Sequence, residues 1–476
     1  MRIGILLTVF ISIQTLMFSQ TTFLENYGLS TDGDYGYKTE ELSSGNYLML
    51  GGKVSQIANE YVGFGILREL DENGNEIWSS NYLGENGESI EIKDFIISSD
   101  NKIVSTGSIS YDFQSDYDNV YICKFDLNGN IIWRTNYGGA NKQWGNKIIE
   151  TSDGGFLIVG FNVVTGSANS TSLYALKVNS NGNMLWEYIQ PNDPNDAIRH
   201  QAYSVKELPN GDFIICGRIH QILHNGNDLF AVKLNSNGIE IWSNIYDYDI
   251  GGELRSISLK SNGNILMSGW IAPNFCAKPI ILEIDTNGTL LSEYVINNNN
   301  NICEWSSDMH LSMNGEITLL SYDNSNYRIV KFDQNFNQLW SQIFNIGLNG
   351  NNAATTINKT FDGGYIITGT SSINNDIQSI VIKTNALGVI LNTYDFTLKE
   401  KLNIYPNPTN DYVKIENLSN NNNTIIIYNS LGQRIKNINT NQENINIPLM
   451  NFTQGIYYMN ILENHKLIQT EKLIIK

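Results

Sequence analysis

Residues 71–78 read DENGNEIW, and the same pattern returns as DLNGNIIW at 126–133, NSNGNMLW at 179–186 and NSNGIEIW at 235–242. In each copy an Asn/Asp-x-Asn-Gly turn is followed by Trp, four residues after its Gly. Asn-Gly accepts the positive φ angles of a tight turn, so each copy predicts a β-hairpin. Degenerate copies lie near Gly288, Phe336 and Gly388.

A second turn, usually with glycine, recurs in step with the first and lies two residues before a large apolar residue. These apolar residues step by 56, 53, 57, 52, 52 and 48 along the chain and are Tyr47, Ile103, Phe156, Phe213, Ile265, Ile317 and Tyr365. The result is seven units of about 53 residues, each with two hairpins and therefore four strands. We predict an all-β fold, a seven-bladed β-propeller over residues 21–397, with an open β-solenoid as the alternative.

Two segments could supply the strand that closes such a ring, and only one of them is needed. Phe23–Gly28 reads FLENYG and resembles WRTNYG at Trp133–Gly138, so a copy of the outer strand precedes the first full unit. Val389–Asp395 could also serve as the outer strand of the last unit. We favour the N-terminal strand, because pairing it with the last unit closes the ring and leaves no unpaired strand edge.

The composition of the 476 residues agrees with strands and turns. Hydrophobic residues make up 41%, charged residues only 16%, and there are 40 glycines. The formal charge is 30 − 48 = −18. Sites that bind nucleic acid or anionic lipid need a cationic surface, so we expect neither as a partner.

Residues 1–19 are predicted to be a signal peptide. Arg2 supplies a short positive region, an apolar stretch follows from Ile3 to Phe18, and Ser19 suits a cleavage site. The stretch is short and polar for a membrane anchor, and no other segment is apolar enough for a transmembrane span.

Residues 398–476 differ in character and are predicted to form a small β-sandwich. Asn becomes dense, and short β-branched runs such as Thr424–Tyr428 and Ile456–Leu462 are separated by turn residues. Four segments in this region carry recognisable motifs: LNIYPNPTNDYVKIE (402–416), IIIYNSLGQRI (425–435), GIYYMNI (455–461) and KLIQTEKLIIK (466–476).

These segments resemble the type A C-terminal sorting domain of the type IX secretion system of Bacteroidetes. By this resemblance the matching motif residues are Tyr405, Pro406, Asn407 and Pro408 in the opening motif, Gly432 in the central turn, Gly455 and Tyr457 in a late strand, and Lys472 in the basic end. The resemblance implies the secretion machinery as a partner of residues 398–476. It also implies passage across the outer membrane, removal of the domain and often attachment to surface lipopolysaccharide. A plain sandwich without a targeting role is the alternative.

Three of the eight tryptophans fall outside the repeat position. Trp144 and Trp305 each lie twelve residues before the large apolar residue of their unit, and Trp270 follows the Gly that closes the second strand. All three are predicted on the face of the longer connections, where binding residues concentrate. Exposed indoles suit sugar rings or protein hot spots, and packing under the loops is the alternative.

The cysteines fall into two pairs. Cys123 and Cys216 lie inside strand patterns and read as buried thiols. Cys276 and Cys303 both map to connections on the predicted loop face, and a secreted protein permits disulfides, so they are a candidate bridge.

No metal site or cofactor is expected. His220 and His224 are four residues apart, but they lie in a loop without an obvious third zinc ligand. Structural Ca²⁺ is the alternative, because acidic residues cluster in three loops, although none has the full calcium-loop spacing. These residues are Asp32 and Asp34; Asp112, Asp116 and Asp118; and Asp247, Asp249 and Glu253.

The sequence contains no motif for a catalytic nucleophile, a metalloprotease or a phosphate loop. We therefore expect a secreted or cell-surface protein whose propeller binds a polysaccharide or a protein without catalysis. An extracellular polysaccharide hydrolase or lyase using paired carboxylates is the rival from another class. A structural adhesin is a third reading.

Overall fold

The computed structural model describes residues 21–28, 33–57, 60–110, 118–139, 142–163, 170–191, 198–221, 226–248, 251–297, 302–346, 352–373, 376–390, 402–418, 423–429, 434–450, 452–463 and 466–476. Within these ranges the chain is all-β apart from one 3₁₀ turn, η1 (Pro273–Phe275). It divides into two compact bodies, Met1–Leu391 and Asn392–Lys476. None of the described residues forms a helix that is long and apolar enough to cross a membrane.

The described strands of the N-terminal body form seven antiparallel groups of four, here called sheets 1–7. A single parallel pair, Thr171 with Arg199, joins sheets 3 and 4 into one eight-stranded sheet. Sheet 1 contains β2 (Gly33–Glu41), β3 (Tyr47–Ile57), β4 (Glu60–Leu70) and β5 (Glu76–Tyr82). Sheet 2 contains β6 (Ser89–Ile97), β7 (Ile103–Ser110), β8 (Asp118–Phe125) and β9 (Ile131–Tyr137). Sheet 3 contains β10 (Gln143–Glu150), β11 (Phe156–Val163), β12 (Thr171–Val178) and β13 (Met184–Ile189). Sheet 4 contains β14 (Ile198–Glu207), β15 (Phe213–Gln221), β16 (Asn227–Leu234) and β17 (Glu240–Tyr246).

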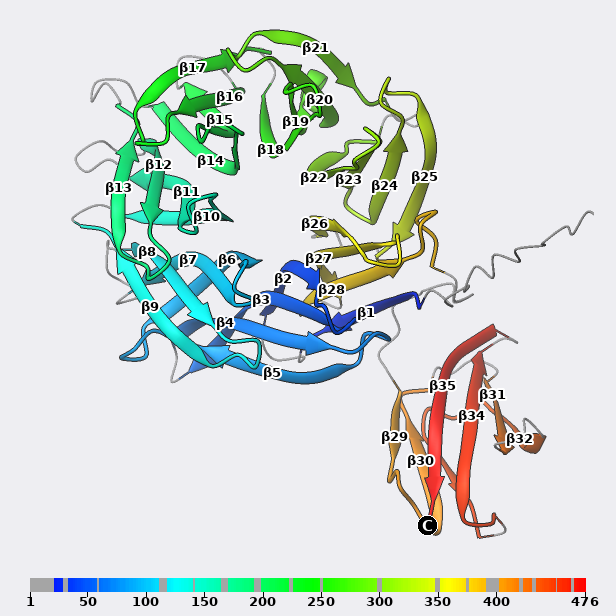
Figure 1. Ribbon diagram of the computed structural model, residues 1–476. Coiled ribbons are helices and arrows are strands. Elements are labelled where there is room, and N and C mark those ends of the chain that lie inside the picture. The colour runs from blue at the N-terminus through cyan, green and yellow to red at the C-terminus, as the bar shows by residue number, and fades with distance from the viewer. Residues whose placement is uncertain are drawn as a thin grey trace, which may run out of the picture. The chain divides into compact units, whose positions relative to one another are not determined.

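The remaining three sheets repeat the pattern. Sheet 5 contains β18 (Gly252–Leu259), β19 (Ile265–Ile271), β20 (Lys278–Ile284) and β21 (Leu290–Val295). Sheet 6 contains β22 (Trp305–Leu311), β23 (Ile317–Tyr322), β24 (Asn326–Phe332) and β25 (Gln338–Asn345). Sheet 7 contains β26 (Ala353–Lys359), β27 (Tyr365–Ile373), β28 (Asp376–Thr384) and the N-terminal strand β1 (Phe23–Tyr27). The sheets follow one another around a central opening, with the first strand of each sheet innermost (Figure 1).

The N-terminal strand completes the last sheet. β1 pairs antiparallel with β28, so that Phe23 lies opposite Lys383. Sheet 7 also contacts sheet 1 directly, because the Asn358 amide donates to the Thr39 carbonyl at 2.9 Å. The N-terminal body thus joins its first and last described strands within one sheet, as the FLENYG copy predicts, and residues 391–395 of the rival strand lie outside the described residues.

The repeated Trp and Gly of the sequence meet between neighbouring sheets. A Cβ atom on Gly129 would lie 3.0 Å from the Trp78 indole, and one on Gly238 would lie 2.5 Å from the Trp186 indole. The Tyr82 hydroxyl adds a 2.6 Å hydrogen bond to the Gly129 carbonyl. Each outer strand therefore holds the outer turn of the next sheet, and that turn needs glycine both for its positive φ and for the indole above it.

The first strand of every sheet has one more residue than its partner strand. Such a β-bulge bends the strand and redirects side chains. The extra residues are Tyr37, Lys93, Asn146, Tyr203, Arg255, Ser307 and Thr355. The bulge brings the first strand close to the second: a Cβ on Gly160 would lie 1.8 Å from the Trp144 carbonyl oxygen. This approach explains why Gly recurs where the second strand reaches the bulge.

The C-terminal body contains two sheets that share one apolar core. The first has the order β29 (Asn403–Tyr405), β30 (Tyr412–Glu416), β33 (Ile445–Pro448). The second has the order β32 (Arg434–Thr440), β31 (Asn423–Asn429), β34 (Gly455–Glu463), β35 (Lys466–Ile475). Alternate residues of the strands, such as Val413, Ile425 and Met459, point into this core and are fully buried.

Candidate functional site

The three tryptophans outside the repeat lie at one level of the N-terminal body. The cross-strand pairs at this level are Trp144–Phe161 in sheet 3, Glu253–Trp270 in sheet 5 and Trp305–Tyr322 in sheet 6. Each pair lies one register step before the pair at which the bulge begins. All three pairs are therefore at the end of their sheet from which the longer connections run, as the sequence predicts.

A cavity of about 270 Å³ lies at this end, between sheets 2 and 3. It is lined by polar and charged residues around one aromatic side chain, namely Ser89, Glu91, Ser108, Ser110, Asp118, Lys142 and Trp144. These residues come from β6, β7, β8, β10 and the connection before β10. Three hydroxyls, two carboxylates and an ammonium group around one indole suit a ligand with many hydroxyl groups.

Trp144 has the geometry of a stacking platform. Its ring is stacked on Phe161, with centroids 4.7 Å apart and planes 18° apart. Phe161 therefore covers one face of the indole, while Trp144 also lines the cavity. The indole N–H has no hydrogen-bond partner in the described part of the chain. A ligand in the cavity would meet both an aromatic surface and a hydrogen-bond donor.

The charges of the cavity are partly neutralised by neighbours. The Glu91 carboxylate forms an ion pair with Lys93, the bulge residue of the same strand. It also accepts a 3.3 Å hydrogen bond from the Tyr37 hydroxyl of sheet 1. Burial, and then the Glu91 charge, raise the pKa of Tyr37 well above its usual value, so this hydroxyl stays a donor. Glu91 is thus an exposed carboxylate that is both ion-paired and hydrogen-bonded.

Trp270 serves a different purpose from Trp144. Its indole N–H donates to the buried Glu253 carboxylate at 3.0 Å, and the same carboxylate forms ion pairs with Arg218 and Arg255. Burial lowers the pKa of Arg255, but the Glu253 charge, the Tyr203 hydroxyl and the hydrogen bond to Glu253 together raise it by more, so the net shift is upward. The Arg255 guanidinium lies 4.0 Å from the centroid of the Tyr203 ring. Trp270 is therefore committed to an internal polar network, which makes it a poor ligand contact.

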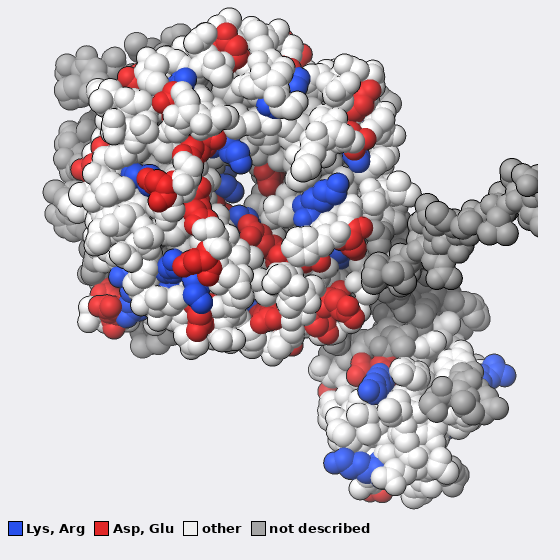
Figure 2. Space-filling model, in the orientation of Figure 1, with Lys and Arg blue, Asp and Glu red and all other residues white. Residues whose placement is uncertain are grey.

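Charged side chains of both signs surround the central hollow of the N-terminal body (Figure 2). On the innermost strands, Lys38 and Lys147 each place their Nζ atom 3.4 Å from an oxygen of the buried Asp94. The Asp94 carboxylate also accepts from the Ile148 amide at 3.1 Å. These ion pairs tie sheets 1, 2 and 3 together, because isolated buried charges would be costly.

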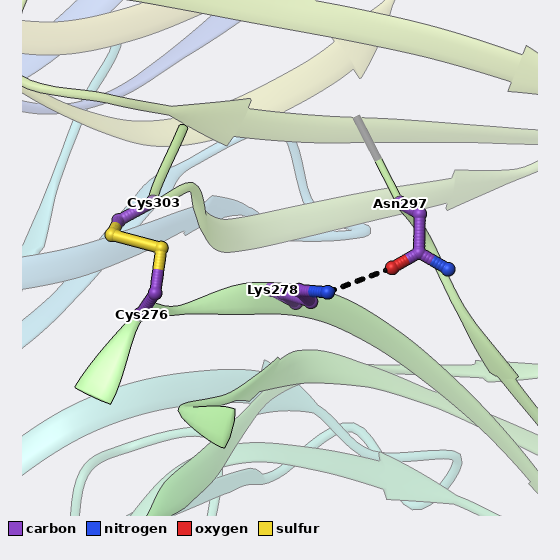
Figure 3. The surroundings of a disulfide bond; sticks show 4 residues. All are labelled: Cys276, Lys278, Asn297 and Cys303. Carbon is purple, nitrogen blue, oxygen red and sulfur yellow. Dashed lines mark hydrogen bonds between the residues drawn. A yellow bond between two sulfur atoms is a disulfide. The ribbon is translucent and has the colours of Figure 1, made fainter. Parts of the chain in front are cut away.

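Trp305 lies beside a disulfide. Its ring is stacked on Tyr322, with centroids 5.8 Å apart and planes 28° apart. Cys303, two residues earlier, is bonded to Cys276, which follows η1 in the β19–β20 connection (Figure 3). Near the bridge, the Lys278 ammonium donates to the Asn297 side chain at 2.9 Å. The other two cysteines, Cys123 and Cys216, are buried free thiols.

The described residues contain no group of three His, Cys, Asp or Glu side chains that could hold a metal ion. The other candidate metal residues have partners or lie elsewhere: Asp34 is buried against Arg68 at 3.0 Å, and His220 Nδ1 lies 3.2 Å from the Gly226 carbonyl. His224, Asp32, Asp112, Asp116 and Asp249 lie outside the described residues. Asp118 lines the cavity.

Sequence reasoning missed most of the cavity, although one signal was available. Glu91 lies twelve residues before Ile103, which is the spacing of Trp144 from Phe156 and of Trp305 from Ile317. A comparison of that position in all seven units would have placed Glu91 at the level of the tryptophans. Ser89, Ser108 and Lys142 carry no such signal, because sheets 2 and 3 contribute them from separate parts of the chain.

In the C-terminal body, the opening motif holds the last strand. Asn407 donates from its amide nitrogen to the Lys472 carbonyl at 2.6 Å and accepts at its amide oxygen from the Ile474 amide at 2.9 Å. The adjacent bonds Tyr405–Pro406 and Asn407–Pro408 are both cis. One side chain therefore satisfies two backbone groups of β35.

The remaining motif residues have simpler surroundings. Gly455 begins β34, and Tyr457 is buried and donates its hydroxyl to the Thr453 carbonyl at 2.9 Å. Tyr405 is exposed, and the Lys414 ammonium lies 5.7 Å from its ring centroid. Gly432 lies outside the described residues.

The comparisons with known proteins identify this body. Residues 403–476 match the family described as the secretion system C-terminal sorting domain. These residues are a sorting domain of the type IX secretion system. The sorting domain marks the protein for export to the cell surface or the extracellular space.

Similarity to individual proteins is confined or weak. β-Agarase A of Zobellia galactanivorans is 40% identical over 75 residues, which are 15% of this chain and 13% of that protein. PorZ of Porphyromonas gingivalis, a bacterial surface component of the type IX secretion system, is 12% identical, with coverage of 92% of this chain and 59% of that chain and a TM-score of 0.41. Sqt1 from Chaetomium thermophilum is 12% identical, with coverage of 73% and 83% and a TM-score of 0.43. Such scores assign neither the fold nor the activity of the N-terminal body.

Proposed function

We propose that residues 21–397 form a seven-bladed β-propeller that the sorting domain delivers to the cell surface, where it binds a neutral polysaccharide without cleaving it. The seven four-stranded sheets around one opening support the propeller (Figure 1). The observation that carries the binding role is the cavity between sheets 2 and 3, with Trp144 stacked on Phe161 as its aromatic wall.

The ligand class follows from the chemistry of the cavity. A sugar ring presents C–H groups to an aromatic face and hydroxyls around its edge, which match the indole and the surrounding serines and carboxylates. At about 270 Å³ the cavity is slightly smaller than most small-molecule sites, roughly 300–1,000 Å³, and suits a single sugar residue of a chain. The net charge of −18 disfavours acidic polysaccharides.

The test is a binding titration with soluble neutral polysaccharides: laminarin, xyloglucan, galactomannan and low-melting agarose, with alginate as the acidic comparator. Trp144→Ala should weaken binding at least about tenfold, roughly 1.4 kcal/mol, while Trp144→Phe retains part of it. Phe361→Ala is the matched control, because this aromatic is 76% exposed in a tight turn at the opposite end of its sheet. Absence of binding by the wild type, or equal binding by Trp144→Ala, refutes the proposal.

A hydrolase is the second candidate, because Glu91 and Asp118 line the same cavity. Two carboxylates at one site could act as acid and nucleophile or base. In that site the Glu91 carboxylate is already ion-paired with Lys93 and accepts a hydrogen bond from the Tyr37 hydroxyl. Release of reducing ends from any of these polysaccharides, abolished by Glu91→Gln and by Asp118→Asn, would replace binding by catalysis.

A further inference from the structure

Sheet 6 repeats the construction of the Trp144 platform. Trp305 and Tyr322 are directly opposite each other on β22 and β23, at the register position of Trp144 and Phe161 on β10 and β11. Both aromatic pairs are stacked, and both tryptophans are partly exposed. Neither indole N–H has a hydrogen-bond partner among the described residues, whereas that of Trp270 is used by Glu253. Two of the three off-repeat tryptophans are thus available for a ligand.

The two platforms lie on opposite sides of the central opening. Strands β10 and β22 are the innermost strands of sheets 3 and 6, and they lie across the opening from each other (Figure 1). Both tryptophans precede the bulge of their strand by the same number of residues, so the platforms are at the same end of the ring. A ligand that contacts both must extend across the mouth of the opening.

The disulfide fixes the approach of the chain to Trp305. Cys303 is bonded to Cys276 of the β19–β20 connection, and the next residue, Glu304, donates its amide to the Ala277 carbonyl at 2.8 Å. The buried Glu304 carboxylate is held by Arg328 at 3.0 Å and by the Ser321 hydroxyl. Trp305 therefore follows a segment that is anchored by a covalent bond, a backbone hydrogen bond and an ion pair. Such preorganisation favours binding because less side-chain and loop entropy is lost.

We propose that Trp305 and Tyr322 form a second sugar-binding platform, and that the two platforms together bind one polysaccharide chain that passes over the central opening. This inference rests on the proposed function and specifies its ligand as the interior of a long chain. Each platform alone binds weakly, but a chain held at one platform is presented to the other at a high effective concentration. Affinity should therefore depend strongly on chain length.

The experiment compares laminarin, xyloglucan and galactomannan with their own disaccharide and trisaccharide fragments, using the full-length chain. Trp305→Ala should weaken binding of the polymer about tenfold or more and leave binding of the fragments at the Trp144 cavity within about twofold. Trp144→Ala should remove fragment binding at the cavity, leaving only weak binding at the Trp305 platform, and should also weaken the polymer. Phe361→Ala should change neither.

A second variant guards against misfolding of Trp305→Ala. Replacing both bridge cysteines, Cys276→Ser with Cys303→Ser, keeps Trp305 but removes the covalent anchor of the segment that precedes it. This double variant should also weaken binding of the polymer only. If the polymer binds and Trp305→Ala leaves its affinity unchanged, or if trisaccharides bind as tightly as the polymer, the second platform is refuted and the Trp144 site stands. If no polysaccharide binds the wild type, the proposed function itself is refuted.

Discussion

His200 makes the stability of the N-terminal body depend on pH. This residue of β14 is only 5% exposed, its ring centroid lies 4.9 Å from that of Phe230, and its Nδ1 atom has no hydrogen-bond partner in the described part of the chain. Burial lowers the pKa of the imidazole from 6.5 to about 4. Above pH 4 the folded protein therefore holds His200 neutral.

The sign of the effect follows from proton binding. Between about pH 4 and 6.5 the unfolded chain binds a proton at His200 that the folded chain does not, so acidification favours unfolding. At roughly 1.36 kcal/mol per pKa unit, the loss relative to neutral pH is about 2 kcal/mol at pH 5 and about 3 kcal/mol near pH 4. The stabilising contribution is complete above pH 6.5.

His200→Phe should remove this dependence, because phenylalanine keeps a ring beside Phe230 but has no proton to bind. The measurement is urea unfolding at pH 7 and pH 5, followed by tryptophan fluorescence. All eight tryptophans precede residue 391, so the signal reports the N-terminal body alone. The wild type should lose about 2 kcal/mol more than His200→Phe between the two pH values. Equal losses would refute the reasoning, since the other titrating groups are common to both proteins.

Two further predictions concern single residues of the two bodies. Asn407→Ala should lower the melting temperature of the sorting domain and the amount of protein exported, because two hydrogen bonds to β35 are lost, each worth about 1 kcal/mol. Asn407→Asp retains the acceptor for the Ile474 amide and should lose less stability. Equal export of the wild type and both variants would contradict a role for these two hydrogen bonds. Gly160→Ala should destabilise the N-terminal body by several kcal/mol, because the new Cβ would lie 1.8 Å from the Trp144 carbonyl oxygen. Gly154→Ala should cost only about 1 kcal/mol, because its Cβ would have open space around it and only the positive φ of 78° opposes the change. Thermal unfolding of both variants checks this order, and a larger loss for Gly154→Ala would contradict it.

Much of the fold could be predicted because its determinants are local and repeated. The turns with Gly129 and Gly238 adopt positive φ, as their Asn-Gly pattern predicts. Between them, β12 is buried along its whole length, whereas the outer strand β9 contains no buried residue. The FLENYG segment predicts an additional outer strand because it resembles WRTNYG, and in the structure this strand, β1, pairs with β28. The sorting domain was recognisable because four motifs are spread over one short segment.

The sequence predicted the position of the tryptophans but not which of them are available for a ligand. The spacing of Trp144, Trp270 and Trp305 from the repeat placed all three at the correct level, but it could not distinguish an open indole from one bonded to Glu253. That difference depends on the residue across the strand pair, which is Phe161 for Trp144 and a carboxylate for Trp270.

The sequence by itself determined the all-β class, the seven-fold repeat of hairpins and the export signal, since each depends on residues that are close in the chain. Only the tertiary structure decided that Glu91, Asp118 and Lys142 gather around Trp144, and that Cys276 bonds to Cys303. Those groupings arise where one sheet packs on the next and where two connections meet. Such contacts depend on the register and twist of whole strands, which no local pattern of residues encodes.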